Sequence, residues 1–182
     1  MRALVVYESM FGNTRSIALA VAEGIARHMP VETLEVSIAP ARLPADVTLL
    51  VAGGPTHAHG MSTAKTRADS AERAGERLVS RGSGVAEWLD TVQPTDAQFA
   101  AAFDTRIKGP GLLWGSAAKQ IAAALERAGF MLVAPAQDFL VGGPLGPMFD
   151  RVVGGELEHA REWGTGLAQA VAGRAQPVAA GV

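Results

Sequence analysis

The side chains best suited to chemistry form a short polar stretch between an apolar run and a helical pattern: Ser9, Met10, Phe11, Gly12, Asn13 and Thr14. The first N–H groups of a helix lack intrahelical partners, and the aligned peptide dipoles add partial positive charge there. Two hydroxyls and an amide can donate further hydrogen bonds, and Gly12 lets the backbone curl around an acceptor. The stretch therefore predicts a phosphate site that needs no lysine. The alternative is that Ser9 or Thr14 merely caps the helix.

The elements around this stretch follow an alternating order of strands and helices. Short apolar runs predict five strands, at Ala3–Tyr7, Val31–Val36, Val47–Ala52, Gln98–Phe103 and Phe130–Ala134. Apolar residues at three- and four-residue spacing predict helices near residues 17–29, 117–128 and 157–171. This alternation favours an α/β fold with one parallel sheet covered on both faces. We expect a doubly wound sheet of order 2-1-3-4-5, which binds ligands beyond the carboxyl ends of its strands.

Composition restricts the class of protein. The chain has 182 residues, which suits one domain, expected at residues 1–173 with a disordered tail at 174–182. A formal net charge of −2 gives no reason to expect nucleic acid as a partner. The absence of cysteine excludes disulfides, thiolate catalysis and iron–sulfur clusters. No run approaches the roughly 18 apolar residues of a membrane span, and no signal peptide is recognisable, so we expect a cytoplasmic protein.

Two motifs resemble those of the flavodoxin family. Tyr7–Thr14 resembles its phosphate loop, in which a hydroxyl residue and two variable positions precede Gly-Asn-Thr. Gly53–Ser62 resembles its second flavin-contacting loop, which often reads Gly-x-Pro-Thr followed by an aromatic residue. The order and spacing of elements extend the likeness from Arg2 to about Ala172, and flavodoxin-domain proteins of actinobacteria are the most similar type. The resemblance implies the flavodoxin-like fold, noncovalently bound FMN, and one- or two-electron chemistry.

The resemblance also implies which residues contact FMN. The first loop would hold the 5′-phosphate, the second would run along the isoalloxazine ring, and a third, from Asp104 to Gly115, would close its other side. The predicted cofactor-binding residues are Ser9, Met10, Phe11, Gly12, Asn13, Thr14, Pro55, Thr56, His57, Ala58, His59, Gly60, Asp104, Thr105 and Arg106. Flavodoxins usually sandwich the ring between aromatic residues. Here the second loop has histidines instead, and Trp114 is the large aromatic residue of the third loop.

His57 and His59 have more than one interpretation. One or both could stack on or hydrogen-bond to the bound ring, or they could be solvated residues of a surface loop. His-x-His is also a spacing found in transition-metal sites. Asp104 could add a ligand, but nothing in the sequence requires it to do so, and the chain has no cysteine. We predict no metal site.

The expected third loop carries charge near the flavin. Thr105 could donate a hydrogen bond to the pyrimidine edge, and Arg106 or Lys108 could lie near the negative charge of reduced FMN. Such cations would make the flavin easier to reduce. The alternative is a solvated basic loop.

Residues 63–96 form a segment longer than one crossover helix requires. Its first part, Ala64–Arg81, mixes Arg with Asp and Glu at three- and four-residue spacing, which predicts a solvated helix with weak salt bridges. Its second part has an apolar stripe typical of a protein core, formed by Val85, Trp88, Leu89 and Val92. We expect part of the segment to form an ordered excursion beside the flavin.

Three functions are compatible with these patterns. The first is electron transfer by an FMN-binding protein that works with a redox partner or a small-molecule acceptor. The second is an FMN-dependent NAD(P)H:quinone or protoporphyrinogen-type oxidoreductase. The third is a binding module that kept the fold and lost the flavin, which the missing aromatic residues would explain. A response regulator is disfavoured because the first strand does not end in the paired acids that hold magnesium.

Overall fold

A computed structural model of the chain describes residues 1–57, 60–95, 98–107, 115–142 and 151–175. A parallel sheet runs through the described residues, with strands β1 (Arg2–Tyr7), β2 (Val31–Glu35), β3 (Val47–Pro55), β4 (Phe99–Ile107), β5 (Met131–Leu132) and β6 (Gln137–Val141). Its order, β2-β1-β3-β4-β5, confirms the predicted doubly wound topology. The sixth strand is an addition that the sequence did not indicate, and it pairs with β4.

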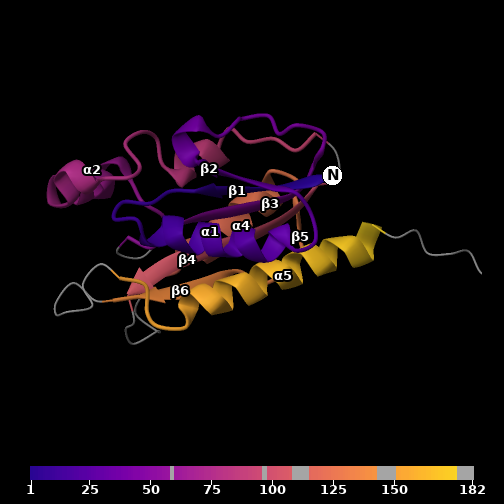
Figure 1. The fold of residues 1–182 in the computed structure, drawn as a ribbon. Coiled ribbons are helices and arrows are strands. Elements are labelled where there is room, and N and C mark those ends of the chain that lie inside the picture. Colours follow the sequence, from indigo (N-terminus) through magenta and orange to yellow (C-terminus); the bar gives the residue numbers. More distant parts are fainter. Residues whose placement is uncertain (58–59, 96–97, 108–114, 143–150, 176–182) are drawn as a thin grey trace, which may run out of the picture.

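Helices lie between the strands and after the last of them: α1 (Asn13–Ala26), η1 (Val36–Ile38), α2 (Ala64–Ala74), η2 (Gly75–Arg77), α3 (Val85–Leu89), α4 (Ala117–Arg127) and α5 (Glu156–Ala175). Helices α1 and α5 cover one face of the sheet, and α3 and α4 cover the other. Helix α2 lies apart from both layers, at the end of the molecule toward which the strands run (Figure 1). None of the helices among the described residues is long and apolar enough to cross a bilayer.

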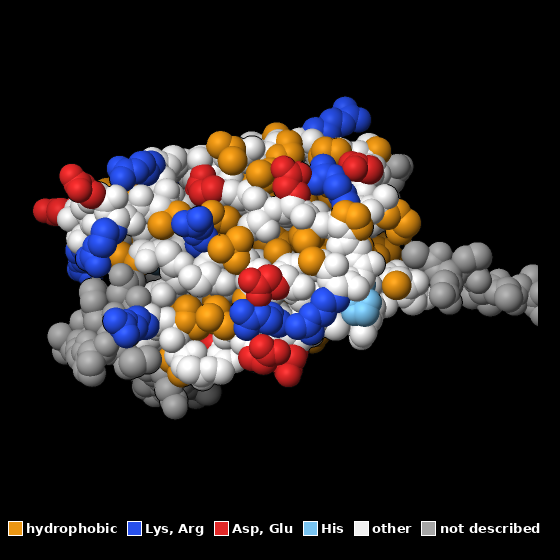
Figure 2. All heavy atoms as spheres, viewed as in Figure 1, with side chains coloured by type: hydrophobic (Ala, Val, Ile, Leu, Met, Phe, Trp, Pro, Cys, Tyr) orange, Lys and Arg blue, Asp and Glu red, His pale blue; other side chains and the backbone are white. Residues whose placement is uncertain are grey.

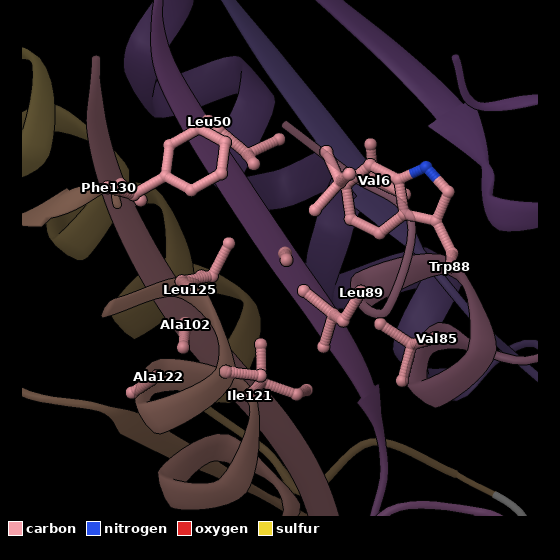
Figure 3. Close-up of a cluster of buried hydrophobic side chains, with 14 of the residues drawn as sticks. Val6, Leu50, Val85, Trp88, Leu89, Ala102, Ile121, Ala122, Leu125 and Phe130 are labelled. Atoms are coloured by element: carbon pink, nitrogen blue, oxygen red, sulfur yellow. The ribbon is translucent and has the colours of Figure 1, made fainter. Parts of the chain in front are cut away.

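The sheet is buried on both faces because its central strands alternate two sets of apolar side chains. In β1, Leu4 and Val6 belong to the cluster under α3 and α4, whereas Ala3, Val5 and Tyr7 belong to the cluster under α1 and α5. Figure 3 shows the first of these clusters, in which Trp88 of α3 lies beside Val6. The predicted apolar stripe is indeed core, since its members are all buried: Val85, Trp88, Leu89 and Val92.

Strand β3 is longer than the predicted Val47–Ala52. It continues through Gly53 and Gly54 to Pro55, although glycine and proline normally favour the end of a strand. A Cβ at Gly53 would lie 2.1 Å from the ring of Phe103, so the glycine accommodates this ring rather than marking a turn. The second loop therefore begins after Pro55.

Strand β4 also continues past its predicted end at Phe103. Asp104, Thr105 and Arg106 lie within the strand, so the prediction that a loop begins at Asp104 was wrong. Strand β6 pairs with this second half of β4, from Phe103 to Ile107, and supplies the hydrogen-bonding partner that keeps it extended. The three side chains are consequently fixed by the sheet.

The predicted fifth strand, Phe130–Ala134, was also wrong in its extent. Strand β5 has only two residues, and the chain then leaves the ladder and pairs again with β4 as β6. Pro135 lies in the interruption, where its missing N–H group prevents it from donating to a neighbouring strand.

The C-terminal boundary differs from the prediction as well. Arg174, expected to begin a disordered tail, lies in α5, and its guanidinium carbon is 5.8 Å from the centroid of the Phe99 ring. Residues 176–182 of the expected tail lie outside the described residues.

Helices α1 and α5 approach each other closely at two glycines. A Cβ at Gly24 would lie 2.0 Å from the carbonyl oxygen of Arg161, and one at Gly164 would lie 2.2 Å from that of Val21. Charged side chains of both signs are interspersed over the outer face of these helices (Figure 2), and Arg161 pairs with Glu23 at 2.6 Å. Because exposed ion pairs contribute only about 0.2–1 kcal/mol, the close backbone approach dominates this contact.

The substitution Gly164→Ala should therefore lower the free energy of unfolding by about 1–3 kcal/mol, because the added methyl group overpacks the α1–α5 contact. The gain in helix propensity, about 1 kcal/mol, is too small to offset this cost. Gly166→Ala is the matched control, since an added Cβ at Gly166 meets nothing within 4 Å and should stabilise the protein. Urea denaturation followed by circular dichroism measures both. Equal effects of the two substitutions would contradict the conclusion that Gly164 allows the close approach of α1 and α5.

Candidate functional site

A cavity of about 390 Å³ lies at the carboxyl ends of β1, β3, β4 and β6. It is the place where all three predicted loops contribute residues. The first loop and the start of α1 form one side, the end of β3 with Thr56 and His57 a second, and the ends of β4 and β6 a third. One face of α2 forms the remaining wall. The structure thus brings together most of the residues that sequence reasoning selected.

The first loop presents the start of α1 to this cavity. The N-cap residue is Gly12, which has φ of 95° and carries no side chain, so neither Ser9 nor Thr14 is the cap of this helix. No acidic residue lies in the first turn, which leaves the positive end of the helix dipole uncompensated by a side chain. The hydroxyl oxygen of Ser9 instead accepts the Gly12 N–H at 3.1 Å and shapes the loop.

A returning segment holds the first loop in place. The Ser9 N–H donates to the Ser80 hydroxyl at 2.9 Å, and the Ser80 N–H donates to the Ser9 carbonyl at 2.8 Å. The Val79 N–H donates to the Met10 carbonyl at 3.1 Å. Part of the 63–96 excursion therefore lies directly against the loop that borders the cavity.

A hydrogen bond between two residues of the cavity lining joins the start of α1 to β4. The hydroxyls of Thr14 and Thr105 lie 2.7 Å apart, and both residues are buried. This bond fixes the rotamers of both side chains, and their remaining hydrogen-bonding capacity lies at the cavity wall.

Known proteins with a similar fold include flavodoxins. No protein-family model and no curated protein matches the chain. Among solved structures, a flavodoxin from the domain Archaea is 18% identical, with a TM-score of 0.61 over 94% of this chain and 99% of that one. Flavodoxin 1 from Bacillus cereus is 16% identical, with a TM-score of 0.65 over 93% of this chain and 98% of that one. The chain has the flavodoxin-like fold.

The same fold also occurs as part of larger proteins. Rubredoxin oxygen:oxidoreductase from Desulfovibrio gigas is 15% identical, with a TM-score of 0.59, and the match covers 97% of this chain and 37% of that one. The likeness to these structures is one of fold, and it agrees with the position of the cavity at the edge where this flavodoxin-like sheet changes its winding direction.

Asp104 lies beneath the cavity rather than among the described residues that line it. Its Oδ2 atom accepts from the Thr56 hydroxyl at 2.7 Å, the Ser116 hydroxyl at 3.0 Å and the Ala118 N–H at 3.0 Å. Complete burial raises the pKa of Asp104, and the nearby Asp138 carboxylate raises it further, whereas these hydrogen bonds oppose the shift. Asp104 therefore ties the second loop to the start of α4.

Arg106 lines the cavity as an ion pair. Its guanidinium lies 2.7 Å from the Asp138 carboxylate, and both side chains are partly exposed. Because Asp138 neutralises Arg106, the net positive charge beside the cavity is lower than the sequence alone predicted. Lys108 and Trp114, the other residues singled out in the third loop, lie outside the described residues.

His57 is bonded to Gly60 across the second loop. Its N–H and carbonyl exchange hydrogen bonds with the carbonyl and N–H of Gly60, at 2.9 and 3.1 Å. Burial lowers the pKa of His57, and the charge of Arg67 lowers it further, so the imidazole is neutral at neutral pH. Gly60 packs against the side chain of Gln120 and, like Gly12, does not belong to the described cavity lining. Ala58 and His59 lie outside the described residues.

The sequence predicts that part of residues 63–96 lies beside the flavin, and the part that lines the cavity is α2, which the sequence predicts only as a solvated helix. The predicted solvated helix Ala64–Arg81 ends at Ala74, and its Arg67 forms an ion pair with Glu87 outside the helix. Four polar side chains of α2 line the cavity: Thr66, Asp69, Ser70 and Arg73. Their i, i+3, i+4, i+7 spacing was the signal that they share one face.

The pH dependence of stability tests the environment of Asp104. Because the pKa of Asp104 is higher in the folded than in the unfolded state, the protonated carboxyl group stabilises the fold. This contribution to the free energy of unfolding is complete below the unfolded-state pKa, near 3.8. It is lost as the pH rises through the folded-state pKa. The permanently neutral variant Asp104→Asn should therefore gain stability relative to the wild type as pH rises, by about 1.4 kcal/mol for each unit of the raised pKa.

Urea denaturation at a series of pH values from 4 to 7 would measure this difference. Asp46→Asn is the control, because Asp46 is an exposed acid paired with Arg2 at the surface. Parallel stability curves for Asp104→Asn and the wild type would show that burial does not raise the pKa of Asp104.

Proposed function

We propose that this chain binds FMN noncovalently and acts in electron transfer. The observation that carries the proposal is the start of α1, which faces the cavity with a glycine at its cap and without an acid in its first turn. Such a terminus suits a phosphate dianion, and the hydroxyls of Ser9 and Thr14 add donors of the required kind. The flavodoxin-like fold supports the same assignment by analogy.

The rest of the cavity fits a flat, largely apolar ring. Its volume falls within the roughly 300–1,000 Å³ of sites that take cofactors. Apolar side chains contribute to the walls of the cavity, namely Pro55, Ile107 and Val141 from the strand ends and Phe11 from the first loop. Residues 9–14 would hold the phosphate, and residues 55–60 together with 105–106 would border the ring. The flavin supplies the electron chemistry when bound, and the protein supplies binding, orientation and electrostatics.

The most direct experiment is an absorption spectrum of the freshly purified chain, followed by mass identification of any released chromophore. Flavin bands together with released FMN would support the proposal. If the protein is colourless, titration with FMN followed by calorimetry decides, and the absence of binding would overturn the proposal. Turnover of NAD(P)H and quinone by the protein alone would identify an oxidoreductase instead of a carrier.

Removing one hydroxyl from the lining of the cavity should weaken FMN binding. We expect Thr14→Val to lower the affinity for FMN about tenfold, because one hydrogen bond to a charged acceptor is lost. Ser16→Ala is the matched control: Ser16 lies in the same helical turn, is exposed, and donates its hydroxyl to the Gly12 carbonyl. Fluorescence titration of FMN measures both variants. An affinity for Thr14→Val equal to that of the control would argue against phosphate binding at this end.

The Arg106–Asp138 pair should tune the reduction potential of bound FMN in two opposite directions. Arg106→Ala leaves a carboxylate at the cavity edge and should lower the midpoint potential, because reduction adds negative charge nearby. Asp138→Asn leaves the cation and should raise it. Redox titration of the two variants gives the sign directly, and shifts in the same direction would contradict this account.

A further inference from the structure

The polar face of α2 is unusual for a helix packed beside a folded domain. Such a helix normally turns an apolar stripe toward the protein. Only Ala74 of α2 is buried, and the stripe that lines the cavity carries a hydroxyl, a carboxylate, a second hydroxyl and a guanidinium. The composition of this face indicates that it meets a polar ligand rather than a protein core.

The direction of α2 assigns its two ends to different ends of the cavity. The helix starts just after the second loop, where the Met61 N–H donates to Gln120 of α4 at 2.8 Å. It ends just before the segment that returns to the first loop, where Val79 bonds to Met10. Arg73 therefore lies at the end nearest the first loop, and Thr66 lies about 10 Å away along the helix axis.

Arg73 forms no ion pair within the part of the chain that the structure describes. Arg67 pairs with Glu87 and Arg106 pairs with Asp138, whereas Arg73 has neither an ion-pair nor a side-chain hydrogen-bond partner among the described residues. Asp69, on the same face, lies one helical turn, about 6 Å, farther from the first loop.

The hydroxyls of the α2 face are already engaged. The Thr66 hydroxyl takes part in the capping box with Thr63, and the Ser70 hydroxyl donates to the Thr66 carbonyl at 2.9 Å. The first loop contains no lysine or arginine, and Arg15, which follows it, is exposed and lies outside the described lining. Arg73 is thus the described cation best placed at the phosphate end.

We propose that Arg73 pairs with the 5′-phosphate and makes this site select phosphorylated flavin over riboflavin. This inference rests on the proposed function. A phosphate monoester carries about −1.5 to −2 charges at pH 7, and a guanidinium can bind two of its oxygens at once. The start of α1 would bind the anion through backbone and hydroxyl donors, and Arg73 would contact it from the wall that α2 forms.

The experiment compares the affinities for FMN and riboflavin of the full chain and three variants, by quenching of flavin fluorescence. We expect Arg73→Gln to weaken FMN binding about tenfold and to change riboflavin binding less than twofold. Arg73→Lys should retain part of the preference for FMN, since lysine keeps the charge but loses the paired donors. Arg77→Gln, an exposed arginine of η2 outside the described lining, should change neither affinity. Raising the salt concentration should reduce the effect of Arg73→Gln on FMN.

The outcomes separate the two proposals. If the wild type binds FMN and Arg73→Gln binds it equally well, the role of Arg73 is overturned and the proposed function stands. If Arg73→Gln loses affinity for FMN and riboflavin to the same extent, with its circular dichroism unchanged, Arg73 only supports the shape of the wall and the inference is overturned. If the wild type binds no FMN, both proposals fail.

Discussion

The hydrogen bonds between residues 9–10 and 79–80 are the constraint on which the site depends. They shape the first loop and carry the chain back across the carboxyl ends of the strands. Because α2 buries only one residue, its own packing gives it little reason to lie beside the cavity. The position of α2 follows from the attachment of both its ends: its start follows the second loop, and the segment after its end is bonded to the first loop. The wall therefore has few buried contacts of its own, which is typical of locally less stable elements.

Glu8 also holds residues 63–96 in place, through a hydrogen bond to the start of α3. Its buried carboxylate accepts the Val85 N–H at 2.7 Å, and burial raises its pKa, while hydrogen bonds and the charge of Arg67 oppose that shift. A Cβ at Gly84 would lie 2.8 Å from Glu8 and 2.4 Å from Arg67, so the backbone must pass between these side chains at a glycine. The end of β1, α2 and the start of α3 thus meet at one buried acid. A buried acid at the end of β1 serves here to position the loops.

The sequence predicted those features that local signals determine. Apolar runs and helical spacing indicated the doubly wound sheet, and the polar stretch after β1 indicated the loop beside the cavity. The misplaced boundaries depend on distant residues: Gly53 continues a strand because of the Phe103 ring, and Asp104 lies in a strand because β6 pairs beside it. The polar face of α2 could be recognised as a face from its spacing. The sequence also predicted that part of residues 63–96 lies beside the site. It could not identify α2 as that part, because hydrogen bonds between residues 9–10 and 79–80, far apart in the sequence, bring the helix there.

Charge is distributed unequally along the cavity, and this follows from the same architecture. At the ends of β3 and β4 the described groups are close to neutral, since Arg106 is paired with Asp138 and burial keeps His57 uncharged. At the first-loop end the helix dipole and Arg73 both favour an anion. This distribution favours a ligand with an anionic terminus and a neutral ring in the orientation that brings the anion to the first loop. This places its ring against the strand ends and beside the ion pair, where a change of charge on the ring has the largest electrostatic consequence.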